Sequence, residues 1–154
     1  MRSPPAAAAS GKLLTGFSMF KALAMGADAC NAARPFLFSL GCIQALKCHT
    51  NKCPTGITTQ DRELSFGLDP TVKASRVARF QHGTVHACVE VVQACGLDSA
   101  SHVQPRHVMR RLSPSSCASL DVLYPHLAVQ QGALLEGKGP AGLLALWEAG
   151  GGGP

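Results

Sequence analysis

The chain has 154 residues, the length of one ordinary domain, whereas a complete (β/α)8 barrel needs about 250. Charged residues make up 15%, against about 25% in typical soluble domains, which indicates that part of the surface is covered by something else. The net charge of +5 is scattered along the chain and aromatic residues are 5%, so we expect no nucleic-acid partner, because such proteins gather their charge on one face.

The first segment, residues 1–9, is small, proline-rich and without periodicity, and we expect it to be disordered. Pro4 and Pro5 stand where the apolar helix of a secretory signal would begin. No uninterrupted run reaches 18 apolar residues, so the sequence predicts no membrane span. We therefore expect a cytoplasmic protein whose seven cysteines stay reduced, where clustered cysteines indicate metal or redox chemistry.

Two helices flank a strand in the first third of the chain. Thr15 is a suitable cap for a helix over about residues 16–25, and Gly26 is a natural stop. Residues 28–33 are typical of a short buried strand. Pro35 suits the first position of a second helix, which we expect to reach about Leu46.

The rest of the chain alternates loop and helix. Residues 47–68 lack any sustained period and predict a loop, and Asp69-Pro70 predicts the start of a helix that runs to about residue 95. Gly83 lies inside that helix, which indicates a bend or close packing there. We expect a further short helix over 105–112, and a flexible tail over 138–154 that ends in glycines.

Three cysteines, Cys42, Cys48 and Cys53, lie within twelve residues in the spacing C-x5-C-x4-C, and Pro54 follows the last. Thiolates are the ligands that iron–sulfur clusters require, and proline after the last ligand is shared with ferredoxin-type runs. A zinc site that adds His49 is an alternative, although zinc loops favour shorter spacings. Inert buried thiols are the third interpretation.

Two turns carry residues that can hold an anion. Ser10-Gly11-Lys12 precedes the first helix, and Asn31-Ala32-Ala33-Arg34 joins the strand to the second helix. Backbone N–H groups at such turns and at helix N-termini bind phosphate, and lysine or arginine adds charge. Taken on its own, each turn is better accounted for by an ordinary connecting loop.

Taken together, these segments resemble the end of the FMN-binding domain of glutamate synthases. The resemblance covers about residues 10–137 and is most specific in the cysteine segment. The segments that carry it are 10–16, 26–28, 40–46, 48–56, 59–60, 107–111 and 123–125. In this family a three-iron four-sulfur cluster is expected, so the resemblance favours a cluster over zinc.

The resemblance implies an α/β fold: the last two β/α units and helical tail of a TIM (β/α)8 barrel, mostly α-helical in this chain. It implies FMN with its phosphate on two loops, which match Gly11 and Lys12 in the first and Ala33 and Arg34 in the second. It also implies a 3Fe-4S cluster on Cys42, Cys48 and Cys53. Pro35 and Phe36 stand where the family often has a small residue, a departure within the second loop.

The family's reaction is the reductive amination of 2-oxoglutarate to glutamate with ammonia derived from glutamine. The resemblance therefore implies as partners an electron donor, either ferredoxin or a pyridine-nucleotide reductase subunit, and a glutaminase domain or subunit. Substrate-binding and catalytic residues lie upstream in the family and match nothing here. We accordingly expect a fragment that is inactive and binds FMN poorly by itself, and a non-catalytic zinc module is the alternative function.

Overall fold

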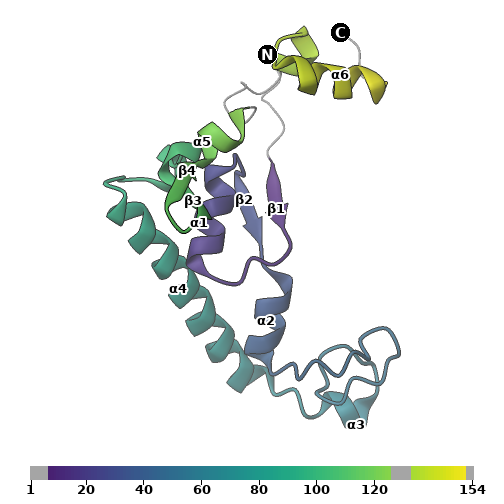
Figure 1. Ribbon diagram of the computed structural model, residues 1–154. Coiled ribbons are helices and arrows are strands. Elements are labelled where there is room, and N and C mark those ends of the chain that lie inside the picture. The colour runs from purple at the N-terminus through teal and green to yellow at the C-terminus, as the bar shows by residue number, and fades with distance from the viewer. Residues whose placement is uncertain (1–6, 126–132, 152–154) are drawn as a thin grey trace.

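The computed structural model describes residues 7–125 and 133–151, and its fold is mixed α/β with short strands (Figure 1). In chain order the elements are β1 (Ala8–Ser10), α1 (Gly16–Ala24), β2 (Ala29–Asn31), α2 (Ala33–Leu40), α3 (Arg62–Ser65), α4 (Pro70–Ala94), β3 (Met109–Ser113), β4 (Ser116–Ser119), α5 (Leu120–Leu123) and α6 (Ala141–Ala149). Short 3-10 turns lie at Ala100–His102, Pro105–His107 and Ala133–Glu136.

The first half consists of two strand–helix units. β1 and β2 pair in parallel, with Ala8 opposite Ala29 and Ser10 opposite Asn31, and α1 connects them. Parallel neighbours need such a crossover connection, usually a helix. This arrangement agrees with the two β/α units that the resemblance implies. Two parallel strands among the described residues are fewer than the eight that a barrel needs, so the complete barrel stays a prediction.

In the second unit, α2 and a long loop stand between β2 and α4. Figure 1 shows α2 continuing beyond the carboxyl end of β2, with the loop that contains α3 farther out and α4 running back along α2 and α1. We call residues 41–69 the cysteine loop. The predicted helix from Pro35 to Leu46 was wrong at both ends, because Pro35 is the third residue of α2 and Gly41, at φ 106°, ends it. Gly41 adopts the left-handed conformation that commonly terminates helices.

The caps of α1 and α4 confirm the sequence prediction. The Thr15 hydroxyl accepts a hydrogen bond from the Ser18 amide at 3.2 Å, and the Ser18 hydroxyl accepts one from the Thr15 amide at 2.9 Å. Asp69 caps α4 by accepting from the Thr71 amide at 2.9 Å. Each cap satisfies amide groups that have no partner inside the helix.

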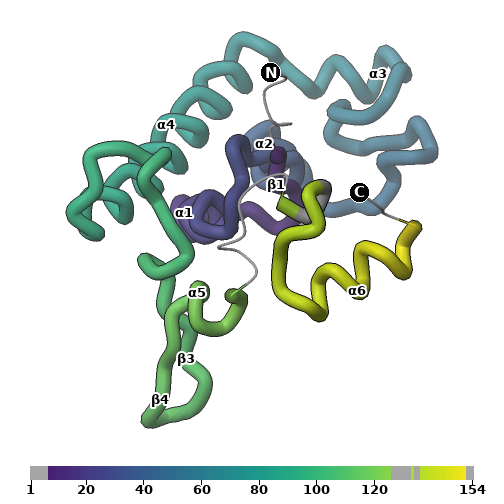
Figure 2. Tube along the Cα trace, turned by 90° about the horizontal axis from the view of Figure 1, so that it is seen from above, coloured from purple at the N-terminus to yellow at the C-terminus, as the bar shows by residue number. Residues whose placement is uncertain are grey.

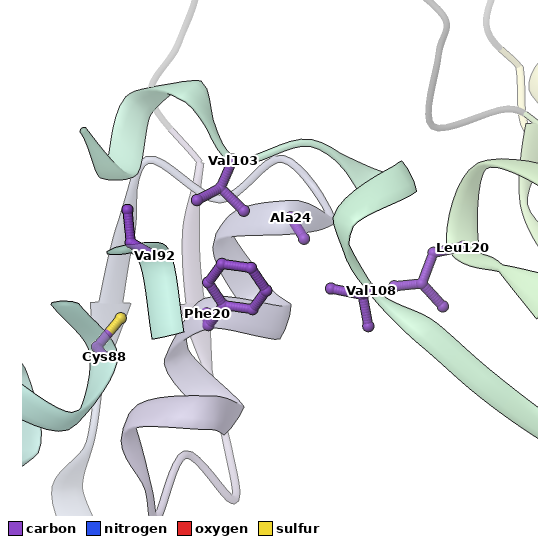
Figure 3. Close-up of a cluster of buried hydrophobic side chains, with 7 residues drawn as sticks. All are labelled: Phe20, Ala24, Cys88, Val92, Val103, Val108 and Leu120. Carbon is purple, nitrogen blue, oxygen red and sulfur yellow. The ribbon is translucent and has the colours of Figure 1, made fainter. Parts of the chain in front are cut away.

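Phe20 is the centre of the core, with 1% of its surface exposed (Figure 3). Around it pack buried side chains from α1, from α4, from the segment that follows α4, and from α5: Ala24, Cys88, Val92, Val103, Val108 and Leu120. Burial of this many apolar groups is the main force that holds α1 against α4. The core therefore lies on the α1 and α4 side of the strands, away from the cysteine loop.

Close helix packing occurs at Gly16 and not, as we expected, at Gly83. A Cβ atom on Gly16 would lie 2.5 Å from the carbonyl carbon of Ala87 and 2.8 Å from its Cβ. A Cβ atom on Gly83 would have open space within 4 Å. Gly16 therefore lets the start of α1 approach the α4 backbone, whereas Gly83 faces away from every neighbour.

Three terminal segments differ from the sequence prediction. The helix expected over 105–112 is a 3-10 turn followed by β3, which pairs antiparallel with β4 around Pro114 and Ser115 and projects away from α1 and α4 in Figure 2. Ala8 and Ala9, expected to be disordered, pair with β2, while residues 1–6 lie outside the described residues. Within the expected flexible tail, residues 141–149 form α6. None of the described helices has the length and hydropathy of a membrane span.

Candidate functional site

The two predicted phosphate turns follow the carboxyl ends of neighbouring parallel strands. Ser10 and Asn31, the last residues of β1 and β2, are register partners, and each is the first residue of its turn. Gly11 has φ 94° and Lys12 has φ 55°, so two successive residues adopt left-handed conformations. Lys12 is exposed. Unusual backbone of this kind concentrates at ligand-binding turns, because it aims N–H groups outward.

The second turn leads into the N-terminus of α2, where Ala33 and Arg34 are the first two residues. The cap residue is Ala32, and no side chain caps the helix. The first amides of a helix have no partner within the helix itself and carry its positive dipole end. Arg34 is exposed beside them. An anion at this end of α2 would meet uncapped N–H groups and a guanidinium.

A hollow of about 530 Å³ adjoins the first turn, between β1 and α1. β1, Gly11 and Lys12 form one wall, and α1 supplies Ser18 and Lys21 on the other. The sequence pattern did not point to Lys21. The signal that could have identified Lys21 is its spacing from Phe17 and Met25. These three residues lie one turn apart on a face of α1 that the core does not use.

Cys42 directly follows the left-handed Gly41 that ends α2. The cysteine is partly buried, and its sulfur accepts a hydrogen bond from the Gln44 amide at 3.4 Å. Gln44 and Leu46 have φ values of 57° and 56°. The chain therefore coils tightly after α2 and turns the Gln44 amide toward the Cys42 sulfur.

Cys53 is the buried member of the three, with 8% of its surface exposed, whereas Cys48 and His49 are exposed. Its sulfur lies 3.3 Å from the Thr55 hydroxyl. Hydrogen bonding from Thr55, then from the Thr58 backbone, lowers the pKa of Cys53 to about 6. The Thr58 hydroxyl is buried and has no hydrogen bond of ordinary geometry, so we assign the main effect to Thr55. These contacts therefore favour the thiolate form of Cys53.

Polar contacts hold the loop around Cys53. Asn51, at φ 60°, accepts hydrogen bonds from the Gln60 amide with its side-chain oxygen and from the Thr59 hydroxyl with its carbonyl, both at 2.6 Å. Asp61 caps α3 by accepting from the Glu63 amide at 2.9 Å. Gly56, at φ 77°, lies so close to α3 that a Cβ atom would be 2.5 Å from the Leu64 carbonyl oxygen.

The structure brings the three predicted cysteines into one loop but leaves the thiols separate. Among residues 7–125 and 133–151, no three cysteine, histidine or carboxylate side chains converge as ligands of one metal ion. The sequence pattern gave no indication of the roles of Thr55, Thr58 and Asn51 around Cys53. Threonines directly after a cysteine–proline pair were the available signal, since their hydroxyls can reach a nearby thiol.

A known protein family matches the part of the chain that contains both turns and the cysteine loop. The family described as the conserved region in glutamate synthase matches residues 2–98. This stretch contains both turns and all three cysteines of the loop. The chain belongs to the glutamate synthase family.

Individual relatives agree with this assignment. The chain is 41% identical over 115 residues to a glutamate synthase large subunit-like protein of Bacillus subtilis. This match covers 75% of the chain and 22% of that protein. The chain is 40% identical over 91 residues to the archaeal glutamate synthase [NADPH] of Methanocaldococcus jannaschii, covering 59% of the chain and 18% of that protein. The chain thus spans about a fifth of the length of these relatives. No solved structure matches it.

Proposed function

We propose that this chain supplies two FMN-phosphate turns and a three-iron four-sulfur cluster loop to a glutamate synthase-type oxidoreductase. The observation that carries the proposal is the pairing of Ser10 with Asn31, because it sets both turns beside each other at one edge of a parallel sheet. Barrel enzymes with parallel strands bind phosphate at this edge, in the loops after their last two strands.

The residues of both sites fit the groups that the family implies. For phosphate, the fit consists of the uncapped start of α2 and the left-handed Gly11–Lys12 turn, with Lys12 and Arg34 as cations. For a cluster, the donors are Cys42, Cys48 and Cys53, with Cys53 inclined to the thiolate form. Because the three thiols do not converge in the described residues, the cysteine loop would have to close around the cluster as it binds. Thiolates are the ligands of iron–sulfur clusters, and each can bind a different iron.

The eight residues of α2 connect the two sites, a length of about 12 Å. In Figure 1 the cysteine loop lies on the same side of the strands as their carboxyl ends. When bound, FMN would supply hydride chemistry and the cluster one-electron transfer. The part of this chain would be to hold the phosphate with Gly11, Lys12, Ala33 and Arg34 and to orient the thiolates.

For the whole enzyme, we propose the reductive amination of 2-oxoglutarate with ammonia from glutamine. Its electrons would come from ferredoxin or a pyridine-nucleotide reductase subunit, and its ammonia from a glutaminase domain or subunit. We propose a cytoplasmic location, since this chemistry draws on a reducing compartment. The described residues form two parallel strands of the eight that a barrel needs, so we expect no glutamate formation by this chain alone.

The decisive test is anaerobic reconstitution of the chain with iron and sulfide, followed by analysis of iron and acid-labile sulfide and by EPR. We expect about three irons and the spectrum of an oxidised three-iron cluster. Cys53→Ser should abolish the signal. Cys117→Ser, which changes an exposed cysteine on β4, is the matched control and should retain it. Stoichiometric zinc without sulfide, or an equal signal in both variants, would refute the cluster proposal.

A further inference from the structure

Two histidines lie on the face of α4 opposite its packed side. The partly or fully buried residues of the helix include Phe80, Thr84 and Cys88, whereas His82 and His86 are exposed. Two residues along an α-helix correspond to a rotation of about 200°. The two histidines therefore point away from the core.

The two imidazoles already lie together as a pair. His82 and His86 are four residues apart, and their ring centroids are 6.1 Å from each other with an angle of 23° between the planes. Residues at this spacing are neighbours on a helix surface. Two histidines at i and i+4 are the arrangement that helical zinc sites use, because one ion can reach a nitrogen of each ring.

Glu90 continues the same row one turn farther. Its carboxylate oxygen lies 3.6 Å from Nδ1 of His86, and about 60% of each side chain is exposed, 62% for His86 and 63% for Glu90. At 3.6 Å the two groups are in close contact but too far apart for a good hydrogen bond. The carboxylate makes the local potential more negative and so favours a cation beside His86.

We propose that His82 and His86 form a surface site for one divalent transition-metal ion of the Zn²⁺, Ni²⁺ or Cu²⁺ class. Imidazole nitrogen is a ligand that suits all three ions. Since no three ligand side chains converge in the described part of the chain, the site has two protein ligands and solvent fills the remaining positions. Both rings are exposed, so small rotations of the side chains can bring their nitrogens to one ion.

The test must separate this site from the cysteine loop, whose thiols also bind metals. Ni²⁺ is therefore added to the full chain, and paramagnetic broadening is followed in ¹H–¹⁵N spectra, which report each amide separately. We expect broadening of amides in residues 78–90 at low Ni²⁺ concentration. Two ligands on one rigid helix act as a chelate, so His82→Gln or His86→Gln should weaken binding there on the order of 100-fold.

His102→Gln is the matched control, because His102 is also exposed and its Nδ1 lies 2.7 Å from Asp98, outside α4. It should leave the broadening of residues 78–90 unchanged. The proposal is overturned if wild-type broadening is confined to the cysteine loop, or if His82→Gln and His86→Gln bind Ni²⁺ at α4 as tightly as wild type. Far-UV circular dichroism of each variant checks that α4 remains folded.

Discussion

The α1–α4 contact and the cysteine loop are stabilised by different kinds of interaction. Between the helices, Phe20, Cys88 and Val92 are almost completely buried. In the cysteine loop, among the residues that the structure describes, only Cys53 and Gly56 are buried, while Leu46 and Phe66 are 82% and 89% exposed. The helices depend on apolar burial, and the loop depends on hydrogen bonds and left-handed residues.

This difference indicates that the two regions respond differently to perturbation. Segments with few buried apolar contacts open at lower free energy than the core, so the loop can rearrange while the helices stay folded. All described non-glycine residues with positive φ lie at Lys12, Gln44, Leu46 and Asn51, in the two regions proposed to bind cofactors. Backbone of this kind needs compensation from its surroundings, which bound phosphate or metal would add.

Phe20→Ala tests the core side of the comparison and should have the largest effect. Removal of a fully buried phenylalanine costs about 3–5 kcal/mol of stability, because the cavity it leaves does not close. Urea unfolding followed by circular dichroism measures the loss. Phe66→Ala, a change at an 89% exposed phenylalanine of the cysteine loop, is the control and should be nearly neutral. Equal effects of the two changes would contradict the assignment of the core.

Gly16→Ala tests the close approach of α1 to α4. The added methyl group would overlap the α4 backbone near Ala87, and overpacking of this kind costs about 1–3 kcal/mol. Gly83→Ala is the matched change on α4, where the methyl group has open space, and it should stabilise the protein by about 1 kcal/mol. The two changes should therefore move the thermal midpoint in opposite directions. Stabilisation by both would show that the helices do not meet at Gly16.

Asn51→Ala tests whether side-chain hydrogen bonds stabilise the cysteine loop. The change removes the side-chain acceptor of the Gln60 amide and puts alanine at φ 60°, so we expect a local loss of about 1–2 kcal/mol. Amide hydrogen exchange should accelerate within residues 48–60 and stay unchanged in α4. If α4 amides exchanged faster to the same extent, loop and core would unfold as one unit.

The parts of the fold with local signals were predictable from the sequence. Thr15 and Asp69 mark the starts of α1 and α4, and Gly26 marks the end of α1, through capping chemistry, which acts within a few residues. β1 was not predictable, because Ala8 and Ala9 form a strand only through pairing with β2. The hairpin of β3 and β4 was not predicted for the same reason, since Met109 pairs with Ser119, ten residues away.

In the candidate site, too, the features with local signals were predictable and those that depend on tertiary contacts were not. The spacing of the three cysteines and the residues of both turns are visible in the sequence. The support that Thr55 gives Cys53 depends on a loop conformation set by Asn51 and Gly56, which no periodic pattern encodes. Likewise, Gly83 and Gly16 are indistinguishable as glycines in helices, and only tertiary packing separates their roles.

Thr55→Val should change chemistry more than stability, and its effect on folding is the smallest of the series. The Thr55 hydroxyl is the main reason why the pKa of Cys53 is about 6, below the ordinary value of 9.0, so its removal should raise that pKa toward 9.0. Because the folded-state pKa is the lower one, the thiolate's contribution to stability is complete above about pH 9 and is lost as the pH falls through about 6.

Alkylation of Cys53 by iodoacetamide in the metal-free chain, followed by mass spectrometry across pH, measures this shift, since only the thiolate reacts. The midpoint of the rate profile should rise in Thr55→Val. It should stay in place in Thr50→Val, a matched loss of a loop hydroxyl that donates to the Lys47 carbonyl at 2.8 Å. A wild-type midpoint already near 9 would mean that the loop does not prepare Cys53 as a thiolate, and the argument for a ligand role would then depend on cysteine spacing alone.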